Sequence, residues 1–299
     1  MWIDIKQANF FWVGVGIAFG IVGYIARAIR WKYLLEPLGY TASFKNRFWS
    51  VIFGYFANLA FPRIGEVARC GVLNKNENIP VDKLLGTVIA ERVIDAFMLL
   101  LLTVITFFVK IELFGTFILE KILIPTKQSV ASVNPLLLGL GIIIFAAIVF
   151  AFIKTRHKYP FVKKISDFFV GLLHGLRSVA QMKERKKFIF HTLLIWFSYW
   201  AMSYVIVFTI PQTAHLDPAD GLFLLIVGGI GMTVPVQGGL GAYHYIVSHA
   251  LVVFGLDQKN DGILFATINH ESQTITIILL GVISVFMLFK NKKSLETSL

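Results

Sequence analysis

Long apolar runs separated by short polar segments dominate the chain. Five runs reach or nearly reach the roughly 20 apolar residues that a helix needs to cross a bilayer. These runs are Phe10–Ala26, Leu84–Val109, Pro135–Ile153, Phe188–Ile210 and Gly262–Phe289. The first run lacks the flanks of a cleaved signal peptide, so we expect it to be retained as a span. The pattern predicts an all-α, polytopic integral membrane protein, since helices satisfy their own backbone hydrogen bonds in lipid.

Two further apolar regions are interrupted. The region Phe48–Phe61 is too short to cross comfortably, and a charged run follows it. The region Leu222–Leu256 is long enough for two thin crossings, but proline and clustered glycines break it between Thr233 and Gly241. Such residues interrupt the hydrogen-bond ladder of a helix. We expect each region either to re-enter the membrane from one side or to cross it fully.

Both interruptions contain the same spacing of proline and glycine. Pro62 and Gly65 lie in the first, and Pro235 and Gly238 lie in the second, where Gly241 extends the break. If the two regions enter from opposite sides, this match indicates an inverted repeat, as in many transporters. A match of two residues also arises by chance, so both interpretations stand. We assign a structural breaking role to Pro62, Gly65, Pro235 and Gly241.

Charge predicts the orientation. Only 15% of the residues are charged, against about a quarter in soluble domains, and the net charge is +11. Basic residues concentrate after the first span, where Arg27 and Arg30 lie, in the central loop and in the C-terminal tail. Such segments belong in the cytoplasm. We therefore expect a multi-pass protein of the cell membrane (inner or plasma membrane), with its N-terminus outside and its C-terminus cytoplasmic, and no nucleic-acid partner.

We expect residues 1–299 to form a single membrane domain in three parts. The first half covers about residues 1–153, a basic loop about 154–187, and the second half about 188–299. Within the loop, apolar residues recur at helical spacing, which predicts an amphipathic helix at the cytoplasmic surface. That helix either packs under the bundle or binds anionic lipid.

Ionisable residues inside an apolar run are the strongest functional candidates. Glu91, Arg92 and Asp95 lie within the second long run. At that depth they are expected to face the protein interior or a water-filled cavity. Their expected partners are Arg63, Glu66 and Arg69 of the preceding interrupted region. This network is either an ion-pair clamp or a substrate contact, and it could serve both purposes.

The breaks themselves are candidate anion sites. A helix that begins at Pro62, or just after Gly239, would direct free backbone N–H groups and a positive dipole end toward a phosphate. The planar guanidinium of Arg63 suits phosphate as well. Gly238 and Gly239 would allow close approach of a ligand, although tight helix packing explains them equally well.

No motif predicts a cofactor or a metal. His244 and His249 are five residues apart and share no helical face, and no H-E-x-x-H zinc motif, P-loop or nucleophile elbow occurs. His270 beside Glu271 either relays protons or caps buried polar groups. The single cysteine, Cys70, excludes an intramolecular disulfide.

Four segments together resemble a known family. They are Arg30–Leu35, Gly54–Arg69, which includes Asn58, Glu91–Asp95 and Pro235–Gly241. They resemble, in order, the flippase-like membrane domain of the lysylphosphatidylglycerol synthase family. The resemblance implies a polytopic domain that moves aminoacylated or other anionic phospholipids between leaflets. His244 stands where that family leads us to expect an acidic residue. The chain ends at Leu299, so we expect a stand-alone member without the soluble aminoacyl-transferase domain, and no lysyltransferase activity.

The leading hypothesis is a flippase-like translocase for an anionic or aminoacylated phospholipid, or for another lipid-linked substrate. Its headgroup would enter a polar cleft between the two interrupted regions, and no catalytic residue is assigned. The candidate substrate-binding residues are Asn58, Arg63, Glu66, Arg69, Glu91, Arg92, Asp95, Gly238, Gly239 and His244.

Two alternatives stay open. One is a membrane-embedded enzyme that modifies lipid headgroups or lipid-linked sugars, with Glu66, Glu91 or Asp95 as acid or base. The other is a noncatalytic subunit that recruits a separate lipid-modifying enzyme. The expected partners are in each case membrane lipids with anionic headgroups.

Overall fold

The computed structural model describes residues 8–111 and 182–289, and every regular element in these ranges is a helix. Four helical segments are long and apolar enough to cross a membrane: Phe10–Leu38, Val81–Val109, Arg185–Thr209 and Gln258–Phe289. The prediction of an all-α, multi-pass membrane protein is therefore confirmed. The predicted span Pro135–Ile153 and the amphipathic loop helix lie outside the described residues.

The spans contain α2 (Phe10–Leu35), α5 (Val81–Val109), α10 (Arg185–Val205) and α13 (Ile263–Phe289). Short helical turns extend three of them: η1 (Glu36–Leu38), η3 (Ile206–Thr209) and η6 (Gln258–Gly262). The chain divides into two compact units, residues 1–103 with 179–299, and residues 104–178.

Each interrupted region folds as two short helices around its break. The first gives α3 (Phe44–Ala60) and α4 (Gly65–Glu77), and the second gives α11 (Pro218–Thr233) and α12 (Ala242–Leu251), with the turns η4 (Gln237–Gly239) and η5 (Val252–Phe254). Even α3, with 17 residues, is only about 26 Å long at 1.5 Å per residue. The four helices are therefore shorter than the roughly 30 Å hydrocarbon core.

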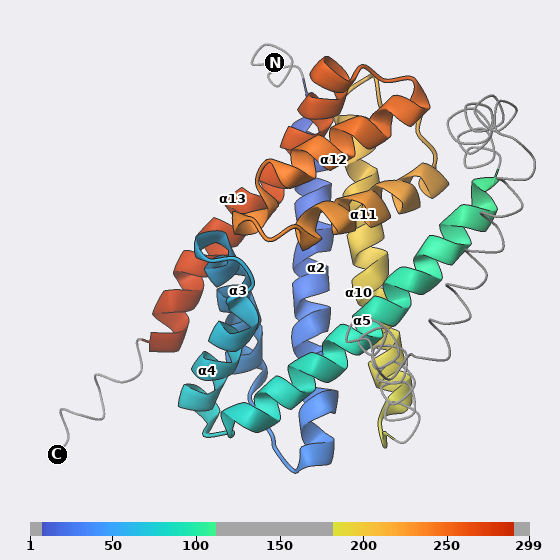
Figure 1. The fold of residues 1–299 in the computed structure, drawn as a ribbon. Helices are drawn as coiled ribbons and strands as arrows, with labels where there is room; N and C mark the ends of the chain where they lie inside the picture. Colours follow the sequence, from blue (N-terminus) through green and yellow to red (C-terminus); the bar gives the residue numbers. More distant parts are fainter. Residues whose placement is uncertain (1–7, 112–181, 290–299) are drawn as a thin grey trace, which may run out of the picture. The chain divides into compact units, whose positions relative to one another are not determined.

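The two described parts of the chain repeat one order of elements in opposite directions. A long helix, two short helices and a second long helix follow one another as α2, α3, α4, α5 and again as α10, α11, α12, α13. In Figure 1, α2 and α10 lie side by side and run antiparallel, and α11 crosses them. The α3–α4 hairpin enters from the end where α2 finishes, whereas α12 returns to the opposite end (Figure 1). This is the arrangement that an inverted repeat predicts.

The breaks lie close to where the sequence places them, with one correction. The second break is confirmed: Gly238, Gly239 and Gly241 have φ of 57°, 80° and 78°, and α12 begins at Ala242. A helix start at Pro62 is wrong, because Arg63 has φ 63° and this left-handed conformation cannot continue a right-handed helix. α4 begins instead at Gly65.

Candidate functional site

Three arginines converge on two carboxylates between α2, α4 and α5. Arg27 Nη1 binds Glu91 Oε1, and Arg27 Nη2 lies 3.1 Å from Asp95 Oδ2. Arg30 Nη1 is 2.8 Å from Asp95 Oδ1, and Arg69 Nη2 is 3.2 Å from Glu91 Oε2. Glu91 is fully buried and Asp95 is 12% exposed, so these carboxylates depend on the arginines for solvation.

A fourth arginine carries the network to the surface of the bundle. Arg92 Nη2 lies 3.3 Å from Glu91 Oε1, and Arg92 Nε lies 3.0 Å from Glu66 Oε1. Arg92 and Glu66 are 47% and 40% exposed. A continuous series of ion pairs therefore links the buried carboxylate of Glu91 to the partly exposed side chains of Arg92 and Glu66.

Arg27 and Arg30 were placed wrongly by the sequence analysis. They were expected in the connection after the first span, but α2 continues to Leu35 and both side chains are buried. Three residues apart, they share one helix face. The informative pattern is the absence of any glycine or proline from Tyr24 to Glu36. As buried ion-pair partners, they carry no information about which side of the membrane the connection occupies.

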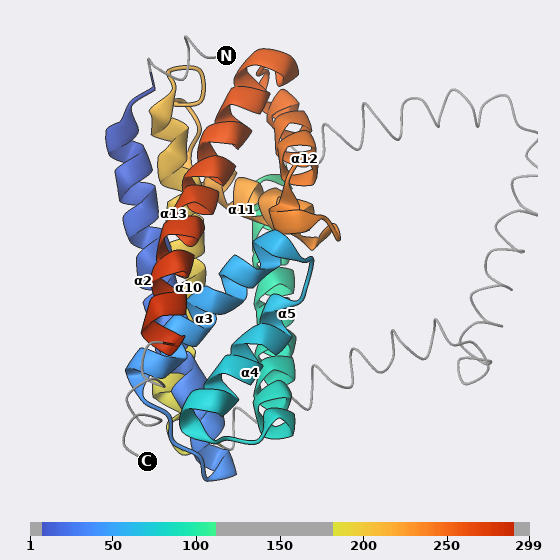
Figure 2. The same cartoon turned by 90° about the vertical axis from the view of Figure 1, so that its left-hand side faces the viewer.

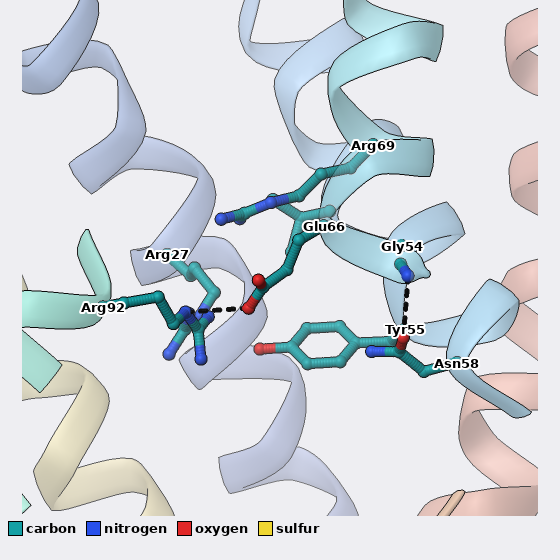
Figure 3. Close-up of a pocket in the computed structure, with 9 residues that line it drawn as sticks. Arg27, Gly54, Tyr55, Asn58, Glu66, Arg69 and Arg92 are labelled. Carbon is teal, nitrogen blue, oxygen red and sulfur yellow. Dashed lines mark hydrogen bonds and ion pairs between the residues drawn. The ribbon is translucent and has the colours of Figure 1, made fainter. Parts of the chain in front are cut away.

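A small pocket opens beside this network, between α3, α4 and α5. Its volume is about 70 Å³, enough for a few waters or a group the size of a phosphate. Figure 3 shows the Glu66 carboxylate directed toward Arg92 and Arg27, with the Tyr55 ring beside them. The polar lining residues are Arg27, Tyr55, Asn58, Glu66, Arg69 and Arg92.

The described network carries one more positive charge than negative. It contains four arginines and the carboxylates of Glu66, Glu91 and Asp95. A buried surplus charge is costly without a counterion, and an arginine fork binds phosphate or carboxylate strongly. The pocket is therefore suited to an anionic group.

Local contacts explain how α3 shapes the pocket. Asn58 Oδ1 accepts a hydrogen bond of 2.7 Å from the Gly65 N–H, which satisfies a free donor at the start of α4. The Tyr55 and Tyr199 hydroxyls are 3.2 Å apart, and Arg27 Nε donates to Tyr199 at 3.2 Å. Asn58 is among the residues predicted from the sequence, but the two tyrosines are not, because a tyrosine in an apolar helix is also an ordinary core residue.

Arg63 lies apart from the pocket, at the tip of the first break. Its guanidinium is exposed and donates through Nη2 to the carbonyl oxygen of Thr233 at 2.8 Å. Thr233 is the last residue of α11, so Arg63 satisfies a carbonyl that the helix leaves free. A Cβ atom at Gly238 would lie 2.8 Å from Leu59. The two breaks therefore meet tip to tip, as the views in Figures 1 and 2 agree.

The remaining predicted residues gather at the second break. His270 Nε2 lies 2.8 Å from the Gly238 carbonyl oxygen, and a Cβ atom at Gly239 would lie 3.6 Å from the same nitrogen. His244 Nε2 is 3.5 Å from Glu271 Oε1. The structure thus divides the predicted site residues into two groups. Glu66, Arg69, Glu91, Arg92, Asp95 and Asn58 form the first, and Gly238, Gly239 and His244 the second.

Comparison with known proteins identifies the family. A UPF0104 membrane protein of Methanocaldococcus jannaschii is 42% identical over 85 residues, which are 27% of this chain and 25% of that protein. No solved structure matches the chain. Residues 1–281 match the family described as Lysylphosphatidylglycerol synthase TM region, which confirms the resemblance of the four sequence segments. The chain therefore belongs to the Lysylphosphatidylglycerol synthase TM region family of lipid-related membrane proteins.

Proposed function

We propose that the protein translocates an anionic or aminoacylated phospholipid, or another lipid-linked substrate, between membrane leaflets. The observation that carries the proposal is the pocket of about 70 Å³ lined by Arg27, Arg69 and Arg92. The pocket adjoins the ion-pair network, which has a surplus positive charge. Both carboxylates at the centre of this network lie on α5, which is otherwise apolar enough to cross hydrocarbon. Glu91 is the eleventh residue of α5, about 15 Å from its start, which is half the thickness of a bilayer core.

The chemistry of the pocket supports binding of a headgroup rather than of acyl chains. A phosphate there would exchange its water shell for guanidinium donors already held in place by Glu66, Glu91 and Asp95. Fixed donors of this kind lower the cost of bringing a charge into a nonpolar medium. The acyl chains would stay in the surrounding lipid. The two helix breaks, one from each half of the chain, meet at Arg63 and Thr233. Paired helix breaks of this kind also occur in alternating-access transporters.

Arg92→Gln tests this proposal with the least disturbance of the fold, because Arg92 is 47% exposed. Loss of a charge-assisted hydrogen bond of roughly 1.5–3 kcal/mol corresponds to about 10- to 100-fold weaker binding of the anion. We expect liposomes containing the variant to translocate fluorescent phosphatidylglycerol at least about 10-fold more slowly than wild type under subsaturating lipid. Lys83→Gln, which removes an exposed cation that does not line the pocket, is the matched control.

Equal translocation by wild type and Arg92→Gln would contradict the proposed role of the pocket. Chemical conversion of the labelled lipid by purified protein, without movement between leaflets, would favour the membrane-embedded enzyme. Recovery of translocation only after a lipid-modifying enzyme is added would favour the noncatalytic subunit.

The proposed orientation, with the N-terminus outside, has its own test. Cys70 is fully buried, and burial raises the pKa of its thiol to about 11, so the wild type should resist maleimides. Cysteines introduced at Lys83 and Lys259 place a reactive thiol at exposed positions in the first turn of α5 and in η6. The start of α5 and the start of α13, which follows η6, lie at opposite ends of the bundle (Figure 1). We expect membrane-impermeant maleimide to label Lys259→Cys in intact cells, and Lys83→Cys only after permeabilisation. The reverse pattern would invert the topology.

A further inference from the structure

Two histidines and a carboxylate converge behind the second break. His244 comes from α12, and His270 and Glu271 come from α13. Glu271 Oε1 lies 3.5 Å from His244 Nε2 and 3.1 Å from His270 Nδ1. One donor atom from each residue lies within 4.8 Å of the other two. Among the residues that the structure describes, this is a compact set of nitrogen and oxygen ligands on two separate helices.

The hydrogen bonds of His270 leave its Nδ1 atom available as a ligand. The Gly238 carbonyl oxygen, 2.8 Å from Nε2, can only accept, so Nε2 carries the proton. In the neutral ring Nδ1 then presents a lone pair toward Glu271 Oε1 at 3.1 Å. Two acceptors that face each other repel unless a proton on Nδ1 or a metal ion lies between them, and a metal ion would use the lone pairs of both atoms. A histidine whose second nitrogen donates to a backbone carbonyl is also the usual arrangement of a metal ligand.

The imidazole of His244 supplies an independent observation. Its Nδ1 is buried and has no hydrogen-bond partner among residues 8–111 and 182–289, while Nε2 faces Glu271. Coordination of a cation through Nε2 would place the ring proton on Nδ1. The contribution of this ring to the site therefore rests on the position of Nε2 rather than on the unpartnered Nδ1.

The distances agree with a transition metal. Zinc bonds to imidazole nitrogen and carboxylate oxygen at about 2.0–2.1 Å, which separates neighbouring ligands of a tetrahedral ion by about 3.3 Å. The separations of 3.1 and 3.5 Å about Glu271 Oε1 bracket that value, and the nitrogens of His244 and His270 lie within 4.8 Å of each other, so a small approach of the two rings would complete the geometry. We propose that His244, His270 and Glu271 form a binding site for a divalent transition-metal ion of the zinc class. Glu271 is 36% exposed, so an ion from solution can reach its carboxylate.

The sequence predicts no metal site because His244 and His249, which lie near each other along the chain, share no helical face. Folding brings His244 instead to His270, 26 positions along the chain. A bound ion would connect α12 to α13 beside the break, much as the Arg69–Glu91 ion pair connects α4 to α5 beside the first break. The site does not depend on the proposed translocation, because binding of an ion is measured without any lipid.

Metal titration of the purified, full-length protein tests the site. The protein is prepared with a histidine-free affinity tag, stripped with chelator and titrated with Zn²⁺, and Co²⁺ is added in parallel to detect the visible absorption of tetrahedral coordination. We expect one high-affinity ion per chain. His244→Gln and Glu271→Gln should each weaken binding at least as much as the roughly 10- to 100-fold that outer-shell partners contribute.

The control is His249→Gln, which removes an exposed histidine of the same helix that bonds to Tyr245 and Gln258 and should keep the ion. Thermal unfolding of each variant establishes that it is folded, and either ligand variant is sufficient for the test. Absence of high-affinity Zn²⁺ binding by the wild type would overturn the proposal. So would equal affinity in a folded His244→Gln or Glu271→Gln variant, or a loss of binding in His249→Gln of the same size.

Discussion

Replacement of Glu91 by glutamine is expected to prevent accumulation of stably folded protein. The substitution keeps the shape of the side chain but removes the carboxylate that contacts Arg27, Arg30, Arg69 and Arg92. Removal of one partner from a buried ion pair costs about 3–5 kcal/mol, a large part of the stability of an ordinary domain. Size-exclusion profiles and thermal unfolding in detergent would measure the loss.

A matched control distinguishes the effect of removing a buried carboxylate from the effect of removing any carboxylate. Glu184→Gln removes a carboxylate that pairs with Lys187 at 2.8 Å on an exposed surface, and it should leave thermal unfolding unchanged. Because the only carboxylate that pairs with Arg69 among the described residues is that of Glu91, Arg69→Gln in the Glu91→Gln background should restore part of the stability by removing an unpaired cation. Wild-type stability of Glu91→Gln would show that the network does not hold the bundle together.

The charged network shows how far sequence can predict this site. Glu91 and Asp95 stand out because charges within an apolar run need partners, and Arg69 and Arg92 follow from nearby positions. Arg27 and Arg30 were missed because the first span was ended at its first charged residue. A helix does not end at a charge, and α2 continues for two turns with both guanidinium groups directed at α5.

Backbone conformation explains why α4 starts later than predicted and why Arg63 lies apart from the pocket. Proline and glycine located both breaks, but the sequence gives no indication that Arg63 adopts φ 63°. This conformation delays the start of α4 and directs the guanidinium to Thr233 on the opposite break. Arg63, expected to bind phosphate, therefore caps a helix of the other half. Contacts between segments 170 positions apart depend on tertiary packing, which local patterns do not contain.

The shape of the pocket depends on how closely the backbones of α3 and α4 approach each other. Gly54 and Gly65 face each other where α3 and α4 approach, and both line the pocket beside Arg69. Each Cβ atom would reach a carbonyl oxygen of the other helix. The absence of side chains at these two positions is what lets Arg69 and Asn58 occupy the same pocket.

Gly65→Ala is therefore expected to separate α3 from α4. Its new methyl group would overlap the Gly54 carbonyl oxygen and lie 2.7 Å from Asn58 Oδ1, and a backbone oxygen cannot move without its helix. Overpacking of this kind costs roughly 1–3 kcal/mol and sometimes more. We expect at least the upper value, together with loss of lipid translocation. Reaction of buried Cys70 with a fluorescent maleimide during heating would report the unfolding midpoint.

Gly71→Ala supplies the same substitution in the same helix with the opposite expected sign. A Cβ atom at Gly71 would meet no atom within 4 Å, and alanine is a better helix former than glycine by about 0.8–1.0 kcal/mol. This variant should therefore unfold at the wild-type temperature or slightly above it and keep its activity. If both variants unfolded alike, close approach of α3 and α4 would not be what shapes the pocket, and Arg27 and Arg92 would have to be positioned by α2 and α5 alone.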